Sequence, residues 1–186
     1  YIAYMASERT KANAWVEERK LEKVDSDEYK ALTTKIEKTS LNVEKYQLDL
    51  VKNNPKKLVS KIVKMSMEVK IPESPVDEAG VIIDSNFRFK YYRNHFFDNV
   101  DLKDDRLVRT PIYHNKLSAY FSKNMMIQHW DTIIKYAFKL CDQFEQGSDM
   151  YQYNVSWITS EYEKSKIMGM DKVFVMMGER YYCGDN

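Results

Sequence analysis

The clearest pattern in the chain is a row of apolar positions between residues 29 and 50. Its members are three or four residues apart, and most residues between them are polar or charged. That spacing predicts a helix whose apolar stripe packs against a second helix. The row comprises Tyr29, Leu32, Ile36, Thr39, Val43, Tyr46 and Leu50. Asp25-Ser26-Asp27-Glu28 is typical of a capped helix start, and a weaker apolar row lies in residues 1–24. We therefore expect an antiparallel helical hairpin over residues 1–53.

Prolines, glycines and capping residues divide the rest of the chain, residues 54–186, into shorter helices. A helix is expected to begin with Pro55 in its first position and to end near Ile71-Pro72, before a loop over residues 72–84. The last helix, residues 171–182, is apolar on nearly all sides and is expected to be buried. The other starts are predicted at Ser85, Thr110-Pro111, Asp131, Gly147-Ser148 and Gly169.

These elements predict an all-α fold of seven or eight helices. The hairpin of residues 1–53 is followed by a compact helical bundle or by stacked helical pairs over residues 54–186, without a repeat of fixed period. The chain has only 5 Gly and 4 Pro, too few for the frequent turns of a β-sandwich or barrel. Its first residues already read as helix and it closes on Gly-Asp-Asn, so we expect a segment of a longer protein.

Composition and charge exclude several classes of function. The chain is 44% hydrophobic and 31% charged, which is typical of a folded protein rather than a disordered one. A net charge of +1 disfavours nucleic-acid binding. No apolar run approaches the roughly 18 residues that a membrane span needs.

The acidic run from Phe96 to Pro111 is the most distinctive stretch. A calcium site would use Asp98, Asp101, Asp104 and Asp105, but the spacing is not that of an EF-hand. Aspartates also form side-chain-to-backbone turns, and Arg106 and Arg109 are near enough to neutralise them, so a structured turn is expected and no metal site. The histidines His95, His114 and His129 share no motif spacing, and packing roles are expected for them.

The aromatic residues before the acidic run suggest a contact surface. Tyr91, Tyr92, Phe96 and Phe97 are the best candidates for a groove that reads peptide or glycan, although such residues are also common in cores. No phosphate loop, nucleophile elbow or other catalytic motif is present, so neither a catalytic residue nor a cofactor is predicted. The candidate interaction surface is Tyr91, Tyr92, His95, Phe96, Phe97, Asp98, Asp101, Asp104 and Arg106.

The two cysteines, Cys141 and Cys183, belong to no C-x-x-C or metal-ligand spacing. Unpaired structural thiols are expected, with a disulfide between them as the alternative.

Three runs resemble a known family. They are KNNPKKLVSKIVKMSMEVKIPE (residues 52–73), FRFKYYRNHFFDNVDLKDDRLVRTPIYHNKL (residues 87–117) and YEKSKIMGMDKVFV (residues 162–175). Together they resemble the helical domain of unknown function that precedes the thioredoxin fold in cell-envelope thiol–disulfide oxidoreductases of Bacteroidetes, proteins similar to the TlpA and ResA types. The resemblance covers most of residues 40–183.

The resemblance implies an exported, periplasm-facing and often lipid-anchored parent protein. Its redox C-x-x-C would lie in a downstream thioredoxin-like domain, so no catalytic residue carries over to this chain. An oxidising compartment makes a Cys141–Cys183 bridge more plausible, although Cys183 departs from the family pattern.

The expected function is therefore that of a non-catalytic accessory domain. It would position the downstream thioredoxin-like domain or select its client proteins. The alternative is a ligand-binding module that recognises peptide or glycan through the aromatics of residues 91–97, which burial of those rings would argue against. An enzyme would need a pocket where Asp98, Asp101 or His95 converge with perturbed pKa values.

Overall fold

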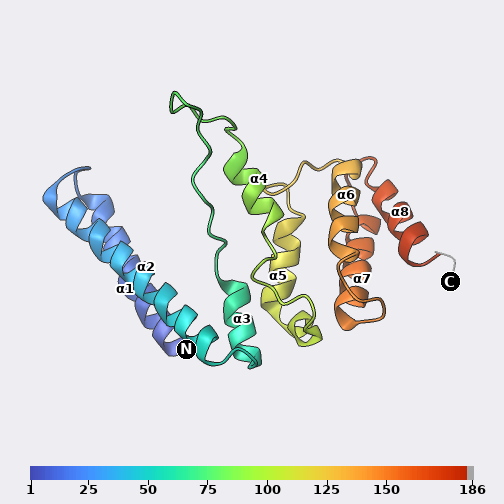
Figure 1. Cartoon of the computed structure of the whole chain (residues 1–186), viewed down its shortest axis with the longest axis horizontal. Coiled ribbons are helices and arrows are strands. Elements are labelled where there is room, and N and C mark those ends of the chain that lie inside the picture. Colours follow the sequence, from blue (N-terminus) through green and yellow to red (C-terminus); the bar gives the residue numbers. More distant parts are fainter. Residues whose placement is uncertain (184–186) are drawn as a thin grey trace. The chain divides into compact units, whose positions relative to one another are not determined.

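The structure is a computed structural model that describes residues 1–183, and its regular elements are helices. Eight α-helices and one 3-10 helix follow one another, and the described residues form one isolated bridge, Val76 with Ile82, but no strand (Figure 1). The all-α prediction is confirmed. The elements are α1 (Ile2–Leu21), α2 (Asp27–Asn53), α3 (Leu58–Ser66), α4 (Phe87–Asn94), η1 (Asp105–Arg109), α5 (Pro111–Tyr120), α6 (Trp130–Cys141), α7 (Asp149–Glu163) and α8 (Asp171–Tyr181).

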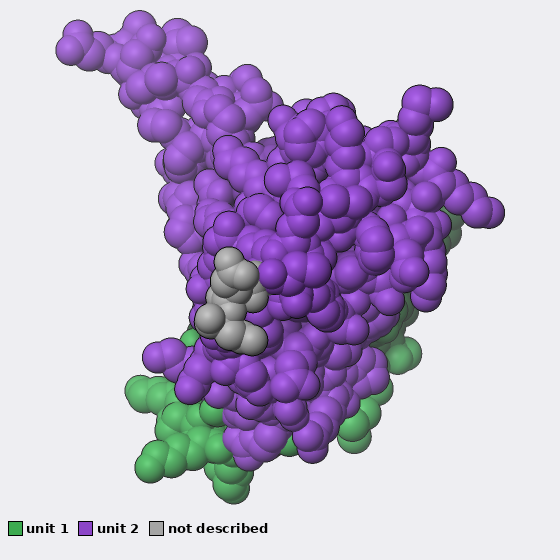
Figure 2. Space-filling view, turned by 90° about the vertical axis from the view of Figure 1, so that its right-hand side faces the viewer, with its two compact units in different colours: residues 1–64 green, residues 65–186 purple. Residues whose placement is uncertain are grey.

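The contacts within the chain divide it into two compact units, coloured separately in Figure 2. We call residues 1–64 the hairpin unit and residues 65–186 the C-terminal unit.

In the hairpin unit, α1 and α2 run antiparallel. The ring of Tyr1 stacks on Tyr46 with centroids 6.3 Å apart, near the start of α1 and the end of α2. At the other end, Arg19 donates a hydrogen bond of 3.3 Å to the hydroxyl of Thr33. The predicted hairpin is confirmed, and every member of the apolar row over residues 29–50 is buried or partly buried.

The start of α2 shows why the turn forms where it does. Ser26 is the N-cap, and its side chain accepts a hydrogen bond of 3.1 Å from the backbone N–H of Tyr29. Asp25, just before it, has φ +71°, a left-handed conformation that acidic and amide side chains tolerate in turns. A capping serine thus satisfies one of the free donors at the helix start.

The third helix is shorter than the sequence predicted. Pro55 lies in a turn, closed by a 3.1 Å bond from the N–H of Lys57 to the carbonyl of Asn54, and α3 begins only at Leu58. It ends at Ser66 rather than near residue 71. Beyond that end the side chain of Asn99 donates to the carbonyl of Met67 at 3.1 Å, a bond that replaces continued helical pairing.

The core of the C-terminal unit is built by α5, α6, α7 and α8 together with η1. Helix α7 contacts α6, α8 and η1, while α6 also contacts α8 and α5 contacts η1. These contacts remove large side chains from water, which is the main stabilising effect in folding. Fully or almost fully buried members are Leu107, Tyr113, Leu117, Ile133, Ala137, Met150, Ile158, Val173 and Met177.

Two predicted helix starts are confirmed by their caps. Thr110 accepts from the N–H of Tyr113 at 3.4 Å ahead of Pro111, and Ser148 accepts from the N–H of Tyr151 at 3.1 Å. The latter follows Gly147, whose φ of +86° favours glycine.

Two other predicted caps are wrong. Helix α4 starts after Asn86 instead of Ser85, because the carboxylate of Asp84 accepts from the N–H of Asn86 at 2.9 Å and forms the turn. Helix α6 starts after His129, and Asp131 lies in its first turn, 2.9 Å from the His129 ring nitrogen Nδ1.

The last helix is less buried than its composition predicted. Val173 and Met177 face the core, whereas Phe174 and Val175 are 38% and 49% exposed. The reason is that α8 packs mainly against α6 and α7, which cover one side of it. Among residues 1–183, no helix combines the length and apolar character needed to cross a membrane.

The cysteine bridge that the resemblance made more plausible is not formed. Cys141 and Cys183 are both free thiols; Cys141 is fully buried in the last turn of α6, whereas Cys183 is exposed beyond the end of α8. Burial raises the pKa of the Cys141 thiol to about 12, so this side chain packs as a small protonated hydrophobe.

Candidate functional site

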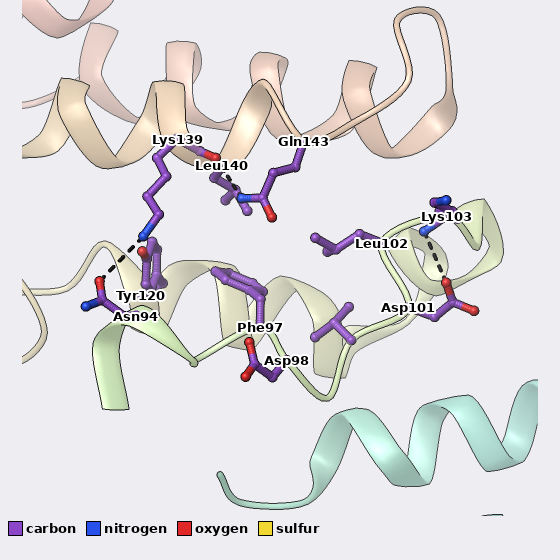
Figure 3. Close-up of a pocket in the computed structure, with 11 residues that line it drawn as sticks. Asn94, Phe97, Asp98, Asp101, Leu102, Lys103, Tyr120, Lys139, Leu140 and Gln143 are labelled. Carbon is purple, nitrogen blue, oxygen red and sulfur yellow. Dashed lines mark hydrogen bonds between the residues drawn. The ribbon is translucent and has the colours of Figure 1, made fainter. Parts of the chain in front are cut away.

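A cleft of about 360 Å³ in the C-terminal unit collects part of the predicted contact surface (Figure 3). One wall comes from residues 94–103, which leave the end of α4, and the opposite wall from the C-terminal part of α6. The lining residues are Asn94, Phe97, Asp98, Val100, Asp101, Leu102, Lys103, Tyr120, Lys139, Leu140 and Gln143.

The base of the cleft is aromatic and apolar. Phe97 meets Tyr120 edge to face with ring centroids 4.9 Å apart, and Val100 and Leu140 are buried on either side. Burial raises the pKa of the Tyr120 phenol to about 12, so the ring stays neutral at physiological pH. Such a base can receive an apolar side chain of a ligand.

The rim of the cleft is polar. Lys139 reaches across from α6 and donates to the side-chain oxygen of Asn94 at 3.5 Å. Gln143, one turn further along, donates to the Lys139 carbonyl at 2.6 Å, and Asp101 accepts from the backbone N–H of Lys103 at 3.2 Å. Both signs of charge are therefore present around an apolar base, a combination suited to a peptide segment.

Three residues of the predicted contact surface line this cleft: Phe97, Asp98 and Asp101. Asp98 also lies 2.6 Å from the Nδ1 atom of His95, which stacks on Tyr91 with centroids 4.0 Å apart. The cleft therefore contains only part of the acidic run and only part of the predicted aromatic group.

The remaining predicted residues have structural roles. Phe96 is 5% exposed and packs edge to face on Tyr92 at 5.5 Å, so it belongs to the core. Asp104 caps η1 and accepts two bonds from the Arg106 guanidinium, at 2.8 and 2.7 Å. Of the four predicted rings Phe97 lines the cleft, while Tyr91 and Tyr92 are partly exposed outside it.

The aspartates of the acidic run make the kinds of bond expected of a structured turn. Besides the bonds of Asp98, Asp101 and Asp104, the Asp105 carboxylate accepts from the N–H of Met150 at 2.9 Å and so ties η1 to the start of α7. Within residues 1–183 no three His, Cys, Asp or Glu residues are placed to hold a metal ion.

Sequence reasoning missed the wall that α6 contributes. Lys139 and Gln143 are polar positions one turn apart beside the buried Leu140, and nothing local links them to the run that begins at Phe96. Tyr120, from α5, is buried and was not part of the predicted contact surface. Lys139 is near the end of α6 and Gln143 lies just beyond it, and α6 also carries the polar residues Asp131 and Lys135, so no local signal marks this pair.

Comparison with known proteins adds a family but no activity. The model of a family described as a domain of unknown function, DUF5106, matches residues 41–185, more than three quarters of the chain, so the chain belongs to that family. No curated protein and no solved structure matches significantly.

Proposed function

We propose that this member of the DUF5106 family is a non-catalytic interaction module that selects or positions protein partners of a thioredoxin-like thiol–disulfide oxidoreductase. The observation that carries the proposal is the cleft between residues 94–103 and α6, in which an aromatic base is surrounded by polar groups of both charges.

The chemistry of the cleft suits a segment of a protein partner. An apolar side chain of the partner fits against Phe97 and Tyr120, and its backbone amides meet donors and acceptors at the rim. Lys139 is exposed on one wall and Asp98 on the other, so charged side chains of either sign find a partner. Specificity would come from these rim groups, and affinity from the buried base.

The redox context of the proposal rests on the resemblance of the three sequence runs alone. That resemblance supplies the downstream thioredoxin-like domain, the Bacteroidetes cell envelope, the periplasmic side and the lipid anchor.

The test uses the parent chain extended through the presumed thioredoxin-like domain. Reduction rates are compared on a folded disulfide protein and on a small aromatic disulfide, with and without residues 1–186. If the module selects partners, its deletion slows only the protein substrate. If the deletion leaves the reduction rates of both substrates unchanged, partner selection is ruled out.

A matched pair of variants then locates the contact. Lys139→Glu reverses a charge on the cleft rim, whereas Lys135→Glu makes the same change one turn earlier on α6, outside the cleft. Because both variants change the net charge equally, general electrostatic steering cancels. We expect Lys139→Glu alone to slow the protein substrate, by roughly fivefold for about 1 kcal/mol of lost contact. Equal effects of the two variants would place the contact elsewhere.

A further inference from the structure

A second hollow surface lies on α7, away from the cleft. It is a shallow groove of about 590 Å³, bordered by Val108 and formed by one face of the helix. The face consists of Asp149, Gln152, Tyr153, Ser156, Trp157 and Ser160, which recur at helical spacing. None of these residues belongs to the proposed partner cleft.

Both aromatic rings on this face are partly exposed and are held in place by neighbours from α5. The hydroxyl of Tyr153 and the Nδ1 atom of His114 are joined by a hydrogen bond of 2.8 Å. The ring of Trp157 packs edge to face with His114, with ring centroids 6.1 Å apart. The ring of Phe121 is tilted against it, also with centroids 6.1 Å apart. Rings fixed in this way lose little conformational freedom when a ligand stacks on them.

The serine hydroxyls on the same face are available. Helical Ser and Thr side chains commonly bond to the carbonyl one turn back, as Thr159 does to Val155 at 2.7 Å. The hydroxyls of Ser156 and Ser160, by contrast, make no hydrogen bond with any residue that the structure describes. Two free hydroxyls one turn apart therefore flank the indole of Trp157.

Among the described residues that line the groove, only Asp149 is charged, and its carboxylate is paired with the guanidinium of Arg109 at 2.8 Å. A charged ligand therefore gains little here, whereas a neutral ligand meets an aromatic surface and uncharged hydrogen-bonding groups.

From this combination we infer that the α7 face is a binding site for a neutral saccharide. A sugar ring presents an apolar C–H face that stacks on Trp157, and its hydroxyls both donate to and accept from Ser156, Ser160 and the amide of Gln152. The inference is independent of the partner cleft, because the two sites share no residue.

The test follows the fluorescence of Trp157 in the whole chain. Substituting the other two tryptophans, Trp15→Phe and Trp130→Phe, leaves Trp157 as the only indole. The chain is titrated with four neutral hexasaccharides, of β-1,4-glucose, α-1,4-glucose, β-1,4-mannose and β-1,4-N-acetylglucosamine. We expect a saturable change with at least one of them. No saturable change with any would overturn the inference.

Calorimetric titration with the hexasaccharide that binds best then assigns the site. Trp157→Ala should abolish binding, and Ser156→Ala with Ser160→Ala should weaken it by roughly tenfold, for two lost hydrogen bonds. Thr159→Ala is the matched control, because that hydroxyl is engaged by the backbone. Equal affinity in the double serine variant and the control would contradict the site. Saturation by a neutral Gly-Ser decapeptide without saturation by any saccharide would also overturn the inference.

Discussion

The hairpin unit and the C-terminal unit are both helical, yet they bury their side chains to very different extents. Helix α1 has no buried residue over its 20 positions, and α2 has only Leu32 and Thr39 over 27. Helix α6 of the C-terminal unit is 12 residues long and buries five. Those five are Ile133, Ile134, Ala137, Leu140 and Cys141.

Two helical units can therefore be stabilised by different kinds of interaction. The C-terminal unit is stabilised mainly by removing apolar surface from water. The hairpin unit depends more on its seam, on helix propensity and on caps, which individually contribute less. Substitutions at matched positions in the two units measure this difference.

The largest effect is expected for leucine truncation in the C-terminal core. Leu117 is fully buried, so Leu117→Ala should cost about 2–5 kcal/mol through lost transfer energy and a cavity. Leu32→Ala in the hairpin seam should cost about 1–3 kcal/mol, and Leu41→Ala, at a position 64% exposed, no more than about 0.5 kcal/mol. Hydrogen exchange under increasing urea measures the free energy of unfolding of each unit separately. A cost for Leu32→Ala as large as that for Leu117→Ala would break the comparison.

The next effect is expected at a buried polar pair. The hydroxyl of Tyr113 donates to the side chain of Asn154 at 2.9 Å, and Asn154 donates to the carbonyl of Met150 at 2.8 Å. Asn154→Ala leaves the buried hydroxyl of Tyr113 without its partner and should cost about 2–3 kcal/mol in urea unfolding. Asn42→Ala, on the exposed side of α2, should be neutral or slightly stabilising because Ala favours helix. Similar costs for the two variants would show that the pair contributes nothing.

A smaller effect, of the same size for both variants, is expected at the N-caps of α2 and α7. Ser26 and Ser148 each accept a bond of 3.1 Å from the N–H three residues on, one in each unit. Ser26→Ala and Ser148→Ala should each cost about 1 kcal/mol. In hydrogen exchange, however, Ser26→Ala should open α2 locally, whereas the core should hold α7. Ser40→Ala, where the hydroxyl bonds back to the carbonyl of Ile36, is the control. Local opening at both caps would contradict the proposed difference.

The smallest effect concerns an exposed ion pair. Lys90, 2.8 Å away, and the N–H of Asn86 both bond to Asp84 and lower the pKa of its carboxyl below 3.8. Since the folded pKa is lowered, the stabilisation is present above the unfolded pKa and is lost as the pH falls through the folded one. Lys90→Gln should raise the pKa of Asp84 back towards 3.8 in a carboxyl NMR titration. An unchanged midpoint would show that the backbone bond alone sets it.

Part of the site was predictable from the sequence, and the rest depended on distant packing. Phe97, Asp98 and Asp101 belong to the acidic and aromatic run and line the cleft, and unusual composition marks such a segment irrespective of its partners. Whether a given ring in that run is core or surface was not predictable. Phe96 and Phe97 are neighbours, yet Phe96 is buried and Phe97 lines the cleft, since Lys116 and Tyr120 of α5 pack on the Phe96 ring.

What the sequence determined by itself is local. Ser26, Thr110 and Ser148 cap helices through bonds to a backbone N–H three residues away, and the row over residues 29–50 specifies its seam by spacing alone. The tertiary structure decided which helix faces are covered. Residues 173–177 of α8 are all apolar, but α6 and α7 cover the face with Val173 and Met177. Capping bonds are complete within one turn, whereas burial depends on helices that the chain brings together from elsewhere in the sequence.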